Sequence, residues 1–138
     1  MFNNPAAAPG QQSLYRFFEV LSDCQGGQTV KVERRNSVRI EYPYPIYLTP
    51  MDEFGNADLE ESFCVLGRHI SERGFDFYHK DPISLKKVVA SFEYSPNRWL
   101  AATADLNWCR FGRHGYFENG GTFGNVVDSP FGIGRIDD

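Results

Sequence analysis

The alternation of apolar and polar residues in several short segments is the feature that most constrains this fold. Between Arg39 and Thr49, apolar side chains occupy every second position, at Ile40, Tyr42, Tyr44, Ile46 and Leu48. A period of two places these side chains on one face of a β-strand. Pro43 and Pro45 have the opposite parity. Because proline lacks an amide donor, we expect this strand to lie partly at a sheet edge.

Shorter strands are predicted along the rest of the chain. After a loop over Pro50 to Asp58, strands are expected at Glu61 to Arg68 and at Phe75 to Lys80. Alternation then continues at Val88, Ala90, Phe92, Leu100, Ala102, Ala104, Leu106 and Trp108. A reversal near Gly112 to Gly115 precedes a last strand through Tyr116, Phe117 and Phe123. About six short strands close most economically into a small barrel, which leaves few exposed edges.

A short amphipathic helix is expected before the first strand, from about Leu14 to Asp23. Ser13 can cap its start, and Gly26 and Gly27 can end it. Its apolar residues fall at positions i, i+3, i+4 and i+7, which is the spacing of one helix face: Leu14, Phe17, Phe18 and Leu21.

The chain of 138 residues suits one hydrophobic core with short extensions. Its 41% hydrophobic content and 13 glycines favour an all-β, or β-rich, domain that reverses direction often. The prediction is a flexible tail over residues 1–12, a short helix and connector over 13–33, a six-stranded antiparallel β-barrel over 34–126 and a C-terminal tail over 127–138.

The formal net charge of −4 argues against general nucleic-acid binding, because the overall field repels polyanions. No apolar run approaches the roughly 20 residues of a spanning helix, and Met1 to Gln12 does not resemble a signal sequence. We therefore expect a cytoplasmic protein without membrane insertion. The cysteines Cys24, Cys64 and Cys109 are odd in number and widely spaced, which favours reduced thiols over a disulfide framework.

A basic cluster lies directly before the first predicted barrel strand, where Arg34, Arg35 and Arg39 occur close together. Arginine suits phosphate and guanine groups, because its planar fork donates two parallel hydrogen bonds and its flat face can stack on a base. In an acidic protein this clustering is consistent with a specific anionic ligand. A solvated basic patch would also explain it.

A second candidate site is the turn His69-Ile70-Ser71-Glu72-Arg73-Gly74. A sharp corner there can point the Ser71 hydroxyl, the His69 imidazole and backbone amides into the same space. A plain β-turn explains the same residues without any ligand, since Ser71 would satisfy its own backbone and Gly74 would supply a positive φ.

Together, the two segments resemble PilZ domains. The segment from Arg35 to Arg39 matches the RxxxR motif of that family, and the segment from His69 to Gly74 resembles its (D/N)xSxxG motif, about thirty residues downstream. Trp108-Cys109-Arg110 and the GxxF sequence from Gly120 to Phe123 are similar to the two closing strands of the family. The resemblance covers roughly residues 33–126.

The resemblance implies a PilZ-type barrel that acts as a receptor for the bacterial second messenger cyclic di-GMP, with no enzymatic activity and no further cofactor. Carried onto this chain, Arg35 and Arg39 would hold phosphate and guanine groups. Ser71 and Gly74 would line the guanine pocket. In the family, an arginine directly before RxxxR accompanies an intercalated pair of ligand molecules, and Arg34 implies such a stacked pair here.

The resemblance also implies signalling to a downstream protein that the sequence does not identify. Binding would fold the arginine segment over the nucleotide and move the N-terminal helix, with Gly26 and Gly27 as a mobile joint. One residue departs from the family pattern, since His69 stands where the family has Asp or Asn. Neutral imidazole offers one acceptor nitrogen and a protonated ring offers none, so we expect weaker or pH-dependent binding.

Three other interpretations compete with a nucleotide receptor. His69 and Ser71 suggest a hydrolase, but no nucleophile-elbow motif accompanies them. A metal site built from Cys64, His69, Cys109 and His114 would lack any CxxC or HxxxH pairing. The third alternative is a degenerate PilZ-like module that binds a protein and no longer binds the nucleotide.

Overall fold

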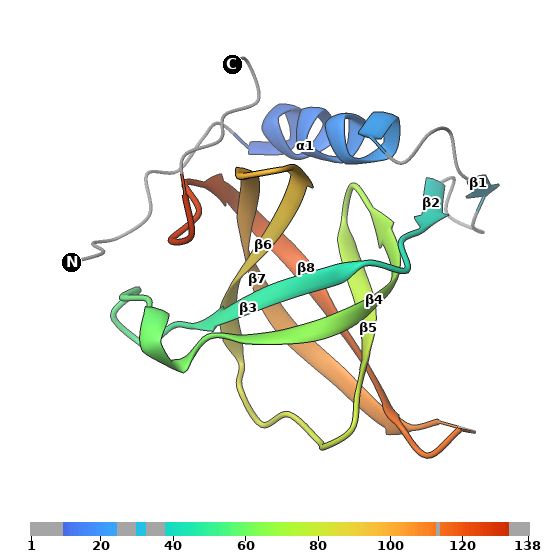
Figure 1. Ribbon diagram of the computed structural model, residues 1–138, viewed down its shortest axis with the longest axis vertical. Helices are drawn as coiled ribbons and strands as arrows, with labels where there is room; N and C mark the ends of the chain where they lie inside the picture. Colours follow the sequence, from blue (N-terminus) through green and yellow to red (C-terminus); the bar gives the residue numbers. More distant parts are fainter. Residues whose placement is uncertain (1–9, 25–29, 33–37, 113, 133–138) are drawn as a thin grey trace.

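The computed structural model describes residues 10–24, 30–32, 38–112 and 114–132. These residues form one α-helix, one short 3-10 helix and eight strands (Figure 1). The bounds are α1 Gly10–Cys24, β1 Val30–Val32, β2 Val38–Glu41, β3 Pro45–Pro50, η1 Leu59–Glu61, β4 Phe63–Ser71, β5 Gly74–His79, β6 Lys87–Ser95, β7 Arg98–Phe111 and β8 Phe117–Val127.

The strands form one antiparallel sheet that closes on itself. Their order is β1-β2-β4-β3-β6-β7-β8-β5, and β5 pairs with β4 as well as with β8. Strands β3 to β8 therefore make a closed six-stranded barrel, and β1 and β2 continue the sheet beyond β4 (Figure 1). The predicted class, a six-stranded antiparallel barrel with a short N-terminal helix, is confirmed.

The segment predicted as one strand from Arg39 to Thr49 is divided in two, because β2 ends at Glu41 and β3 begins at Pro45. Pro43 falls in the break, and Pro45 is the first residue of its strand, where a missing amide donor disturbs the ladder least. The expectation of an edge position was wrong. Strand β3 pairs with β4 on one side and with β6 on the other.

Helix α1 lies across one end of the barrel and packs against β8 and β6 (Figure 1). Leu14, Phe17 and Leu21 are buried, as their helical spacing predicts. The ring of Phe17 lies 5.4 Å from that of Phe92 and 5.3 Å from that of Phe123. The helix starts about one turn earlier than predicted, inside the segment expected to be a tail. No helix among the described residues is long and apolar enough to cross a membrane.

The chain after β8 packs back on the barrel as far as Gly132. The buried Ser129 hydroxyl lies 2.8 Å from that of Ser91, and the ring of Phe131 stacks on Trp99 at 5.1 Å. The sequence had placed residues 127–138 in a tail. Its glycine-rich, non-periodic composition gave no sign of these contacts.

Candidate functional site

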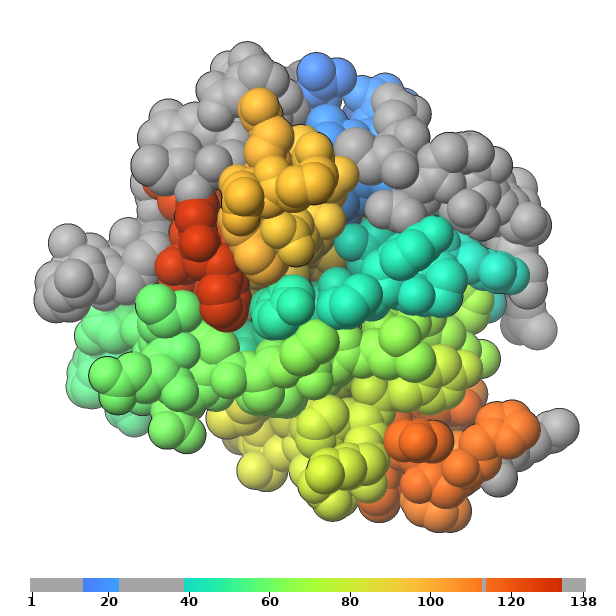
Figure 2. All heavy atoms as spheres, in the orientation of Figure 1, coloured from blue at the N-terminus to red at the C-terminus, as the bar shows by residue number. Residues whose placement is uncertain are grey.

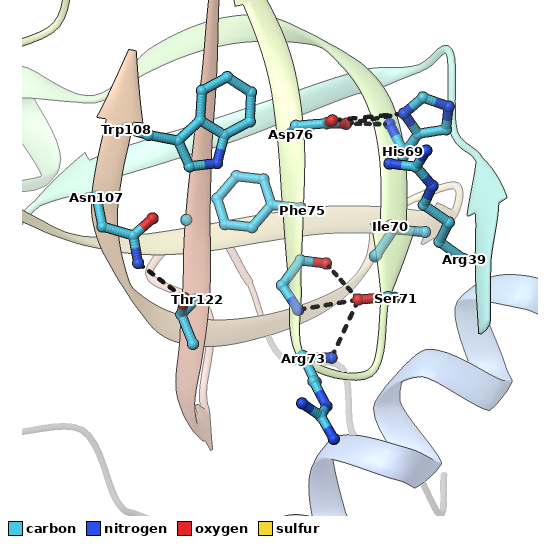
Figure 3. Close-up of a pocket in the computed structure, with 12 residues that line it drawn as sticks. Arg39, His69, Ile70, Ser71, Arg73, Phe75, Asp76, Asn107, Trp108 and Thr122 are labelled. Carbon is cyan, nitrogen blue, oxygen red and sulfur yellow. Dashed lines mark hydrogen bonds and ion pairs between the residues drawn. The ribbon is translucent and has the colours of Figure 1, made fainter. Parts of the chain in front are cut away.

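The described residues of both predicted motifs meet at one depression on the barrel surface. Arg39 from β2, His69 and Ser71 from the end of β4, and Gly74 from the start of β5 all line it (Figure 3). Arg39 is the register partner of Ser71 across the β2–β4 pair, which brings the arginine to the turn. The volume is about 380 Å³, at the lower end of the range of roughly 300–1,000 Å³ for ligand pockets.

The other two predicted site residues, Arg34 and Arg35, lie outside the described residues, as does the joint at Gly26 and Gly27. The depression also contains residues that were not predicted to belong to the site. They are Ile70, Arg73, Phe75, Asp76, Asn107, Trp108, Gly121 and Thr122.

The β4–β5 turn is held together by the Ser71 hydroxyl. Its oxygen accepts the amide N–H groups of Arg73 and Gly74, each at 3.2 Å, and the hydroxyl donates to the Gly74 carbonyl at 3.3 Å. Gly74 does not have the positive φ that a plain β-turn predicted. A glycine is needed there because a Cβ would overlap the backbone carbonyl oxygen of Gly121 on β8. Ser71 therefore shapes the turn, and Gly74 lets β5 and β8 approach.

His69 faces a carboxylate on the neighbouring strand. Its backbone N–H donates to Asp76 Oδ1 at 2.8 Å, and its ring Nδ1 lies 3.2 Å from the same oxygen (Figure 3). Because an ionised carboxylate can only accept, the ring contact requires the proton on Nδ1. In the neutral ring, Nε2 is then left as a hydrogen-bond acceptor.

Burial lowers the pKa of His69 below its ordinary value of 6.5. The carboxylate of Asp76 acts in the opposite direction and raises this pKa, whereas the charges of Arg39 and Arg68 lower it. The side chain is only 12% exposed. His69 is therefore neutral at pH 7 and presents an acceptor nitrogen rather than a positive charge.

A chain of ion pairs runs outward from Asp76 across the barrel surface. Arg68 Nη1 lies 3.5 Å from Asp76 Oδ2 and 3.5 Å from Glu118 Oε1. Arg110 binds the same Glu118 oxygen at 2.9 Å. The pairs join strands β5, β4, β8 and β7, so the carboxylate beside His69 is held by a network of side chains.

Trp108 on β7 provides an aromatic surface at the depression. It is paired across the sheet with Gly120, and the indole lies where a Cβ of that residue would be. Even so, 41% of the residue is exposed. The Arg110 guanidinium lies 5.5 Å from the ring centroid. The indole rests on the backbone of Gly120 and has the Arg110 guanidinium over its ring, and its exposed part can stack against a planar ligand.

The neighbouring Asn107 has a different role at the same edge of the depression. Its amide nitrogen donates to the Thr122 hydroxyl at 2.8 Å, which links β7 to β8 beside the indole (Figure 3).

The geometry bears on the two chemical alternatives. The Ser71 hydroxyl interacts with the backbone of its own turn, and the His69 Nδ1 nitrogen faces Asp76, so the pair is not arranged as nucleophile and base. Among the described residues, no group of three or more His, Cys, Asp or Glu side chains is placed to hold a metal ion.

No family model matches the sequence, and no curated protein matches it. Among solved structures, the fold is similar to that of the Bacillus subtilis inhibitor of motility, MotI/DgrA, with a TM-score of 0.54 and 15% sequence identity. The match covers 70% of this chain and 45% of that chain, so the present chain spans less than half the length of MotI/DgrA. MotI/DgrA is a PilZ-domain protein, and the barrel described here has a PilZ-like fold.

Proposed function

We propose that this chain is a receptor that binds cyclic di-GMP in the depression between the β4–β5 turn and Trp108. One observation carries the proposal. Arg39, His69 and Trp108, which lie on three different strands, all line one depression of a PilZ-like barrel. Arg39 can bind an anion, His69 can accept from a hydrogen-bond donor, and Trp108 can stack on a planar ring. Cyclic di-GMP contains all three features.

The phosphates of the ligand would be held by the arginines. Arg39 lines the depression. Its positive charge lowers the pKa of His69, so its electrostatic effect reaches the inside of the site. Arg34 and Arg35 precede it in the sequence and would add two further forks. Each cyclic dinucleotide carries two phosphate charges, and three arginines provide cover for a stacked pair of ligands.

A guanine base would be read by His69. The neutral ring offers Nε2 as an acceptor for the N–H donors of guanine, which is the role that Asp or Asn would have at this position. Asp76 keeps the proton on Nδ1 and so maintains that acceptor. The departure from the family motif is thus compatible with binding.

The signal would leave the site through helix α1. The β4–β5 turn at Arg73 lies next to the helix (Figure 3). Leu14 of α1 lines one small hollow together with Glu72, Arg73 and Phe123. A ligand that moves the turn would therefore act on the helix and on the surface shown to a downstream protein.

Calorimetric titration at pH 7.5 tests the proposal, with cyclic di-AMP as the control ligand. We expect micromolar or tighter binding of cyclic di-GMP with two nucleotides per chain, and weaker binding of the adenine analogue. If neither ligand produces heat or competes with a labelled nucleotide, the chain is a PilZ-like protein-interaction module without nucleotide binding.

Replacement of Trp108 with alanine is expected to weaken cyclic di-GMP binding by about tenfold. The variant removes a base-stacking surface, which is typically worth about 1–3 kcal/mol. Because Trp108 is 41% exposed, the barrel should remain folded. Calorimetry on Trp108→Ala and Trp108→Phe checks the effect, and the phenylalanine variant should keep most of the affinity. Equal affinity of the original protein and both variants would show that the indole does not contact the nucleotide.

Affinity for cyclic di-GMP is expected to fall as the pH is lowered from about 7.5 to about 5.5. The pKa of His69 lies below 6.5, so the ring is neutral at the upper pH and gains a proton below that value. Protonation removes the Nε2 acceptor, and loss of one hydrogen bond costs about 1–3 kcal/mol, which is roughly tenfold or more.

The matched variants are His69→Asn, which should bind with little pH dependence, and His79→Asn, which should behave as the original protein. The charged residues around His69 are Arg39, Arg68 and Asp76, which act on its pKa, and Glu41, which is its register partner on β2. Tighter binding at the lower pH would mean that the imidazolium attracts phosphate, and would contradict the assignment of His69 to guanine.

A further inference from the structure

A second hollow lies at the end of the barrel opposite α1. It is bordered by β4, β5 and the hairpin between β7 and β8 (Figures 1 and 2), and its volume is about 660 Å³. Its apolar walls are formed by Val65, Leu66, Tyr78 and Tyr116. Leu66 and Tyr116 are each 51% exposed. Bulky apolar groups gathered around an open hollow mark a surface that binds another molecule. We call this hollow the hairpin groove.

The polar part of the hairpin groove contains one lysine, two histidines and one carboxylate. Lys80, His79 and His114 line it beside the apolar walls. Glu118 is the one carboxylate among its described lining residues, and this group already contacts Arg110 at 2.9 Å and Arg68 at 3.5 Å. Because Glu118 is already paired with two arginines, Lys80 provides a positive charge beside the apolar walls, although the chain as a whole is acidic.

We propose that the hairpin groove docks an acidic peptide segment of a partner protein. A leucine or aromatic side chain of the segment inserts between Leu66 and Tyr116, and its neighbouring carboxylates pair with Lys80 and the histidines. The mode is that of an apolar anchor in a pocket with a complementary charged rim.

The groove is connected to the depression by two arginines. Arg68 contacts Asp76 in the depression and Glu118 in the groove. Arg110 binds Glu118 and lies over Trp108. A ligand that contacts His69 or Trp108 therefore acts on both partners of Glu118 and changes the charge offered to the peptide. This coupling rests on the proposed nucleotide binding, whereas docking itself does not.

Selection from a phage-displayed library of random peptides on the immobilised full chain tests the docking. We expect enrichment of peptides with a leucine or aromatic residue flanked by Asp or Glu. Leu66→Glu and Tyr116→Ala should each weaken the selected peptide by more than about tenfold in fluorescence anisotropy. Phe54→Glu, at a residue 74% exposed on another loop, is the matched control and should have no effect.

Docking is overturned if no peptide is enriched, if basic or purely polar peptides are enriched, or if binding survives both groove variants. Adding saturating cyclic di-GMP then tests the coupling, and we expect the peptide affinity to change at least about threefold. An unchanged affinity with nucleotide bound refutes the coupling alone. Peptide binding without any nucleotide binding refutes the proposed receptor function and leaves the docking site intact.

Discussion

The double variant Arg35→Ala, Arg39→Ala is expected to lose more than about 100-fold of its affinity for cyclic di-GMP. Hydrogen bonds to charged groups contribute about 1.5–3 kcal/mol each, so two lost arginine contacts correspond to roughly 3–6 kcal/mol. Arg39 lines the depression next to the turn formed by Ser71 and Gly74, and Arg35 is the other arginine of the RxxxR motif. Calorimetric titration at pH 7.5 measures the loss.

The matched control is Arg98→Ala, which removes an exposed arginine on β7 that bonds to the Tyr94 hydroxyl. It should bind as the original protein does. Because both variants remove positive charge, an equal loss of affinity in the two would indicate a non-specific charge effect. An unchanged affinity of the double variant would mean that the nucleotide binds elsewhere on the chain.

Replacement of Phe17 with alanine is expected to lower the free energy of unfolding by about 3–5 kcal/mol. The ring is fully buried and lies edge-on to Phe92 and Phe123, so truncation opens a cavity between α1 and the barrel. Chemical denaturation followed by circular dichroism measures the change. Tyr15→Ala is the control on the same helix, since that residue is 56% exposed.

A loss of less than about 1 kcal/mol for Phe17→Ala would contradict the docking of α1 on the barrel end. The same variant bears on signalling. Phe123 also stacks on Phe75, whose neighbour Gly74 follows the turn of the site as the first residue of β5, so the helix and the depression share one aromatic cluster. A helix that does not contribute to stability would leave the proposed output route without support.

Most of the fold follows from periodicity, because alternating residues identify a strand whatever its neighbours are. The alternation at Ile40, Ile46 and Leu48 predicted buried faces, and all three residues are buried. Pairing partners do not follow, since they depend on contacts far apart in the sequence. The two prolines therefore suggested an edge, although β3 is central and the prolines lie in a break and at a strand end.

Site residues that belong to a short local motif could be predicted from the sequence. Site residues that reach the depression only through the register of the sheet could not. Arg39, His69, Ser71 and Gly74 were identified from two short motifs, and the structure places all four at one depression. Their binding role stays a prediction.

Asp76 and Trp108 were missed as site residues, because they reach the depression through pairing with His69 and Gly120 on other strands. One signal was available for Trp108. The Gly120-Gly121 pair follows the tryptophan strand after a reversal, and a glycine across from an exposed tryptophan is the pattern of an aromatic ring packed on bare backbone.

The most direct measurement is tryptophan fluorescence during titration with cyclic di-GMP, because the chain has two tryptophans and one of them lines the depression. Trp99 stacks on Phe131, so Trp99→Phe leaves Trp108 as the only reporter. We predict saturable quenching of this variant with the affinity found by calorimetry, and no change in Trp108→Phe. Binding heat without quenching would place the nucleotide away from the depression. The absence of both heat and quenching would contradict the receptor function itself.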